Sequence, residues 1–92
     1  MIAVLVLDCH LYDCHSLKQK RAVIRPILSR LGQVVHMAAT ETGHHDLWQR
    51  AELTIVAVGH ERRPLERDLD TALSWLDDQA TLDARIVLRG FQ

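Results

Sequence analysis

Aromatic side chains are scarce in this sequence. Among its 92 residues there are only four, namely Tyr12, Trp48, Trp75 and Phe91. Because 48% of the residues are hydrophobic, the chain has enough apolar side chains to fold, and a disordered chain would be far poorer in them. The core must therefore consist mainly of Leu, Ile, Val and Ala. A chain of this length predicts one domain, residues 1–92, with a small core.

Long hydrophobic runs are also missing. Residues 1–7 are apolar, but a membrane-spanning helix needs about 20 such residues. No basic residue precedes this segment and no small-residue cleavage site follows it, so it does not match a signal peptide. We therefore interpret it as a strand and expect a cytoplasmic protein without membrane contact. In such a chain the two cysteines, Cys9 and Cys14, are expected to be free thiols.

The chain has no excess of charge of one sign. Eleven Lys and Arg nearly balance twelve Asp and Glu, which gives a net charge of −1. A balanced charge exerts no general attraction on nucleic acid. Any binding of nucleic acid would therefore have to come from a local basic patch.

The motifs of several large enzyme classes are absent as well. There is no P-loop, no dinucleotide-binding glycine pattern and no glycine-rich nucleophile elbow. Ser16 or Cys14 beside His15 is a conceivable nucleophile, but neighbours in sequence rarely have the geometry that activates one. We therefore expect no catalytic residues, no cofactor and a non-enzymatic module, since fold alone does not imply an activity.

Four segments have the hydrophobic pattern of β-strands. In the segment 47–59, Ala51, Leu53, Ile55 and Ala57 share one face. In the last segment, Ala84, Ile86 and Leu88 are expected to face inward. The four predicted strands are residues 2–7, 34–41, about 47–59 and 82–89.

Two further segments have helical periodicity. The first runs from Leu17 to a stop at Gly32, with Ser16 as the expected N-cap. Pro26 lies inside this segment and removes one backbone donor, so it should kink the helix or divide it in two. The second helix is expected to begin near Pro64 and to end at residues 77–78, where two aspartates oppose the helix dipole.

The predicted order β-α-β-β-α-β is typical of the ferredoxin-like α+β fold. Each helix has one apolar stripe, so both should cover one face of a four-stranded antiparallel sheet. The other face would be lined by apolar side chains and is too apolar for open water. We expect it, or a sheet edge, to form a homodimer, and a partner surface on RNA-binding machinery is the alternative. The side chains concerned are Ile2, Val4, Val6, Thr54, Val56 and Val58.

Two short motifs resemble a known family. They are residues 15–21, HSLKQKR, and residues 46–51, DLWQRA, and with the total length they are similar to the small bacterial YlxP-like family, a domain of unknown function. His10 lies where that family tends to carry histidine. The resemblance implies a ferredoxin-like fold. It also implies a link to RNA or ribosomes, because members are often encoded beside transcription and ribosome-maturation genes. Cys9, Cys14 and Pro26 depart from the family pattern.

The first motif contains a candidate binding surface. Lys18 and Arg21, with Arg25 one turn later, fall in a narrow arc of the predicted helix and are candidates for binding the phosphates of RNA or of a ribosomal partner. The alternative is an ordinary solvated helix face. Lys20 instead lies on the apolar side of the helix, where it should form a structural ion pair. Asp8, Glu41 and Asp46 are its candidate partners.

The second motif places Trp48 close to Arg50. A tryptophan beside an arginine can stack on bases or anchor a protein interface. The alternative is a tryptophan that covers the edge of a small core. Both residues therefore remain candidates for partner binding.

Cysteines and histidines gather near the predicted end of the first strand. These side chains could serve as ligands for a metal or a small molecule, and an oligomeric regulatory domain that binds such a ligand is the alternative to RNA binding. Their spacing does not match the usual pairs of a structural zinc site, so no metal is expected. The candidate ligands are Cys9, His10, Cys14, His15, His44 and His45.

Overall fold

The computed structural model describes all 92 residues, and the order of its elements confirms the predicted β-α-β-β-α-β arrangement. The four strands form one sheet in the order β2-β3-β1-β4, and all neighbouring strands are antiparallel. The elements are β1 (Ile2–Leu11), α1 (Leu17–Gly32), β2 (Met37–Gly43), β3 (Arg50–Val58), α2 (Arg62–Asp77) and β4 (Leu82–Phe91).

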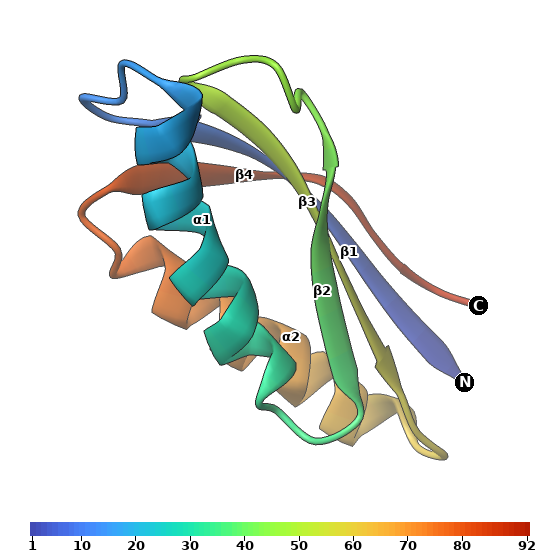
Figure 1. Cartoon of the computed structure of the whole chain (residues 1–92). Helices are drawn as coiled ribbons and strands as arrows, with labels where there is room; N and C mark the ends of the chain where they lie inside the picture. Colours follow the sequence, from blue (N-terminus) through green and yellow to red (C-terminus); the bar gives the residue numbers. More distant parts are fainter.

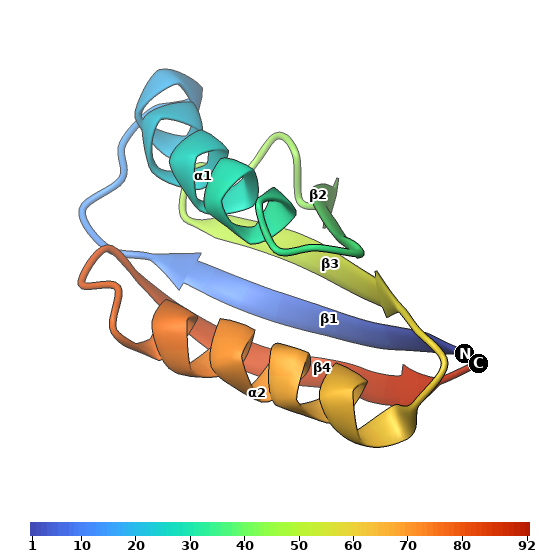
Figure 2. The same cartoon turned by 90° about the horizontal axis from the view of Figure 1, so that it is seen from below.

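Both helices cover the same face of the sheet (Figure 1). α1 packs on the β2 side, whereas α2 contacts β1, β3 and β4 (Figure 2). This two-layer arrangement is the ferredoxin-like α+β fold, as predicted. The two termini lie side by side, since Ile2 and Gln92 exchange a pair of backbone hydrogen bonds. Neither helix has the length and hydrophobicity that a membrane-spanning segment needs.

The core lies between the sheet and the two helices. β1 and β3 are the central strands, and their alternate side chains are fully buried because both helices cover that face. The other face of the sheet, here called the open face, carries no helix. The core side chains from these two strands are Ala3, Leu5, Leu7, Cys9, Leu11, Ala51, Leu53, Ile55 and Ala57.

The start of α1 is stabilised locally. The Gln19 backbone N–H donates to Ser16 Oγ at 3.0 Å, so Ser16 is the N-cap, as predicted. The Gln19 side chain in turn accepts from the His15 backbone N–H at 2.7 Å. Pro26 does not split the segment, because the helix continues through it to Gly32. Because this cap fixes where α1 begins, it also sets the positions of Lys18 and Arg21 in the first turns of the helix.

The strand boundaries differ in part from the predicted ones. β1 continues to Leu11, while β2 begins only at Met37. His36 has a left-handed backbone with φ of 65°, and Val35 before it is 72% exposed in a turn, so the predicted start at residue 34 is wrong. β3 likewise begins at Arg50 rather than near residue 47.

The prediction that Leu88 faces inward is also wrong, since Leu88 is 51% exposed and pairs with Val6. Ile86 pairs with core residue Leu7 but is not buried, since it is 53% exposed. The pairing of β1 with β4 shifts register between Val6 and Leu7, where Val87 is left without a partner. Such a bulge reverses the alternation of side chains along a strand. Leu88 therefore lies opposite Val6 on the open face. Ile86, opposite Leu7, remains exposed on an edge strand.

Candidate functional site

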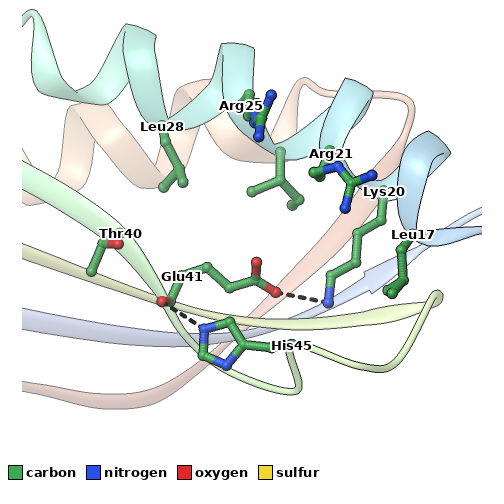
Figure 3. Close-up of a pocket in the computed structure, with 9 residues that line it drawn as sticks. Leu17, Lys20, Arg21, Arg25, Leu28, Thr40, Glu41 and His45 are labelled. Atoms are coloured by element: carbon green, nitrogen blue, oxygen red, sulfur yellow. Dashed lines mark hydrogen bonds and ion pairs between the residues drawn. The ribbon is translucent and has the colours of Figure 1, made fainter.

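A pocket of about 410 Å³ lies between α1 and β2 (Figure 3). One wall is helical and carries three cations, while the other wall comes from β2 and the loop that follows it. Its lining residues are Leu17, Lys20, Arg21, Ile24, Arg25, Leu28, Thr40, Glu41 and His45.

Lys20 forms the inner end of this pocket. Its side chain is only 3% exposed, and its Nζ lies 2.7 Å from Glu41 Oε2. Nζ also donates to the His44 carbonyl oxygen at 2.6 Å. The contact with Glu41 is an ion pair rather than an aligned hydrogen bond, since Oε2 is buried and has no hydrogen-bond donor. Of the three candidate carboxylates, the structure therefore places Glu41 beside Lys20.

Arg21 and Arg25 lie at the outer edge of the pocket, on the same helix (Figure 3). Both are exposed, and neither has a carboxylate within ion-pair distance. Lys18, one turn before, is also exposed and unpaired. We call Lys18, Arg21 and Arg25 the basic face of α1. Four other arginines each lie beside a carboxylate: Arg50, Arg62, Arg85 and Arg89.

Charge is strongly segregated between the elements. α1 contains five of the eleven Lys and Arg of the chain and none of its twelve Asp and Glu. Only Lys20 among these five has an acidic partner. Arg30, near the end of α1, was not among the predicted contacts. Counting the charges of residues 17–32 would have included Arg30, because this segment contains no Asp or Glu.

Trp48 and Arg50 do not belong to the basic face. Trp48 lies in the loop between β2 and β3, and Arg50 begins β3 with its Nη2 2.9 Å from Asp8 Oδ2 on the open face. Trp48 is 50% exposed and lies outside the core, whereas Trp75 packs against the core. The loop forms a shallow hollow of about 440 Å³ with Trp48 and Arg50 in its lining.

The cysteines and histidines are dispersed over different parts of the fold. Cys9 and Cys14 are free thiols buried in the core. Burial raises the pKa of Cys9 from 9.0 to about 12, and Asp8 and Asp83 add to the effect. His10 lies exposed on the opposite face of β1. No three His, Cys, Asp or Glu side chains are grouped in a way that could hold a metal ion.

The remaining histidines of the candidate set lie near α1. His15 is exposed just before the N-cap, and its backbone rather than its ring makes the contact with Gln19. His44 contributes its carbonyl oxygen to Lys20. The ring of His45 lies in the lining of the α1–β2 pocket, with Nε2 3.2 Å from the Glu41 carbonyl oxygen. His45 thus shares a pocket with Arg21 and Arg25 of the basic face.

Fold and surface together define a small ferredoxin-like domain with one acid-free basic helix. Comparison with known proteins gives its family: residues 2–88 match the family described as a protein of unknown function, DUF503, and the chain belongs to it. The chain is 35% identical to the uncharacterized protein YlxP of Bacillus subtilis (strain 168) over 86 residues, which is 94% of each chain. These matches confirm the resemblance that the two short motifs indicated.

Proposed function

We propose that this domain is a cytoplasmic, non-enzymatic module that binds RNA or ribosome-associated machinery through the basic face of α1. The observation that carries the proposal is the combination of Lys18, Arg21 and Arg25 on one exposed arc with no acid anywhere on the helix. In a chain of net charge −1, a helix with this composition creates a local positive potential. Guanidinium groups hold phosphate oxygens in bidentate geometry.

The shape of the basic face favours a phosphate chain over a single small anion. From Lys18 to Arg25 the helix rises about 10 Å at 1.5 Å per residue. Three cations spread over this length can each contact a different one of the successive phosphates of a nucleic acid. Contacts of this kind position a partner without reading its sequence, and the few cations available predict weak, salt-sensitive binding.

The proposal is tested by titrating an RNA hairpin and isolated ribosomal subunits against two charge-reversal variants at two salt concentrations. We expect the Lys18→Glu/Arg21→Glu protein to bind at least about tenfold more weakly than the wild type. The control, Arg63→Glu/Arg67→Glu, makes the same charge change at exposed, unpaired positions of α2 and should bind nearly as well as the wild type. Equal loss in both variants, or no loss in either, contradicts the proposal.

The same proposal includes a second copy of the chain as a partner. The half of the open face near the termini is apolar and carries no charged side chain on its central strands, with Val4 and Val6 of β1 beside Val56 of β3. Exposed Val58 and Leu88 extend this surface. An apolar patch is complementary to itself under twofold symmetry, so a homodimer is the simplest way to cover it.

A further inference from the structure

Two exposed aromatic side chains lie at the same end of the sheet. Tyr12 directly follows β1 and is 51% exposed, and Trp48 precedes β3 and is 50% exposed. The antiparallel pairing brings the two segments together, since the Leu11 N–H donates to the Gln49 carbonyl oxygen at 2.8 Å. The other two aromatic residues of the chain, Trp75 and Phe91, pack against the core. Neither Tyr12 nor Trp48 is therefore explained by core packing.

The surroundings of these rings are polar and hollowed. Tyr12 lines a hollow of about 390 Å³ on the open face, and the other lining residues are His10, the two arginines Arg50 and Arg85, and the carboxylates Asp8 and Asp83. His10 and Tyr12 pack edge to face, with ring centroids 5.4 Å apart and an interplanar angle of 78°. Arg50 also lines the neighbouring hollow that contains Trp48, so the two hollows adjoin at this residue. We call His10, Tyr12, Trp48 and Arg50 the aromatic end.

The basic face begins at the same end of the molecule. The short connection after β1 leads directly into α1, so the first turn of α1, the loop before β3 and the start of β4 lie together (Figure 1). Lys18 and Arg21 belong to the first two turns of that helix. Because α1 and the open face lie on opposite sides of the sheet, a strand of nucleic acid that contacts these cations would pass around this end of the sheet to reach the aromatic end.

We infer that the aromatic end stacks unpaired bases of the RNA partner, on the rings of Tyr12 and Trp48, while the phosphates run toward Lys18 and Arg21. The inference rests on the proposed function and narrows its partner to RNA with unpaired nucleotides. Base stacking on aromatic rings tolerates any sequence, because every base has a π-face. The bases inside a duplex are stacked on each other and cannot reach such rings. Arg50 is paired with Asp8, and its planar guanidinium can still stack on a base beside them.

The test compares three RNA probes with equal numbers of phosphates: an unstructured single strand, a blunt duplex, and a single strand with abasic sites in place of bases. We expect the single strand to bind best and to quench the fluorescence of Trp48. The Trp48→Ala and Tyr12→Ala variants should each bind the single strand about 5- to 100-fold more weakly, and Trp48→Phe should retain most of the affinity. Binding of the abasic strand should not change in any of these variants.

The outcomes separate this inference from the proposed function. If the wild type binds none of the probes, both fail. If it binds the duplex and the single strand equally, and Trp48→Ala changes neither, the basic face binds RNA and only the stacking of bases is refuted. A loss for the abasic strand as large as that for the normal strand also refutes stacking. Since both rings are half-exposed, the variants should keep the wild-type melting temperature, which thermal denaturation checks.

Discussion

Cys9 shows how a single residue responds to its place in this fold. The thiol is buried on the helix-covered face of β1, and its neighbours in space include the carboxylates of Asp8 and Asp83. Burial and these negative charges disfavour the thiolate and raise the pKa of Cys9 from 9.0 to about 12. A thiol of this kind is inert, so Cys9 acts as a small apolar core residue rather than as a ligand or nucleophile.

The raised pKa predicts a loss of stability in alkaline solution. Between pH 9 and about 12 the unfolded chain releases the thiol proton and the folded chain retains it. The unfolded state then binds fewer protons, so the free energy of unfolding falls as pH rises through this range. Urea denaturation at several pH values should show this fall in the wild type and a smaller one in Cys9→Ala. An equal slope in both proteins would contradict the assignment, and Cys14→Ala provides a comparison at the other buried thiol.

At the scale of elements, Lys20 joins α1 to the end of β2. It is the only buried charged residue, and its Nζ connects α1 with Glu41 of β2 and with the carbonyl of His44 in the next loop. The loop that carries Trp48 starts at this point. The hydrogen bond from Lys20 to the His44 carbonyl oxygen therefore ties α1 to the loop that carries Trp48.

Removal of Lys20 should destabilise the protein. In Lys20→Ala, Glu41 and the His44 carbonyl lose their partner in a buried setting, which should lower the free energy of unfolding by about 2–4 kcal/mol. The control is Arg85→Ala, whose ion pair with Asp83 is 3.7 Å long and largely exposed and should contribute less than about 1 kcal/mol. Urea denaturation measures both variants. A loss in Lys20→Ala no larger than that in Arg85→Ala would show that the buried pair has no stabilising role.

Much of the element order could be predicted from the sequence, and the exceptions have physical causes. The strict alternation in β3 predicted its buried face, because one face of a central strand must meet the helices. In β4, Ile86, Val87 and Leu88 are all apolar, so their pattern cannot reveal a bulge that depends on pairing with β1. Likewise, the helical position of Lys20 predicted an ion pair, but the choice among three carboxylates depends on how β2 packs against α1.

The candidate site was predictable only in part for a similar reason. The arc of Lys18, Arg21 and Arg25 follows from helix geometry alone, and the structure places these residues as expected from that geometry. Trp48 and Arg50 come from the second motif and became candidates because a tryptophan beside an arginine can stack on bases or anchor an interface. Arg50 instead lies on the open face beside Asp8, since strand pairing rather than sequence distance decides which face a residue occupies.

At the scale of the whole molecule, the open face is divided into two halves. Along β1, the residues on the open face change from apolar to polar: Ile2, Val4 and Val6 are followed by Asp8 and His10. β3 shows the same change in the antiparallel direction, from Val58 and Val56 at one end to Arg50 at the other. The apolar half lies near the termini, and the polar half belongs to the aromatic end. The proposed second copy and the proposed RNA strand would therefore use different halves of this face.

The proposed homodimer predicts a mass of about twice 10.5 kDa at micromolar concentration. Val58 and Leu88 are 53% and 51% exposed, so the double variant Val58→Lys/Leu88→Lys should fold normally. In a symmetric interface, however, each lysine would face apolar surface or another lysine, and the variant should be a monomer.

The control, Val35→Lys, alters a side chain that is 72% exposed but lies in the turn before β2, and it should remain a dimer. Multi-angle light scattering measures all three proteins. A wild-type mass near 10.5 kDa up to about 100 μM would exclude the dimer. A double variant that remains a dimer would show that the interface lies elsewhere.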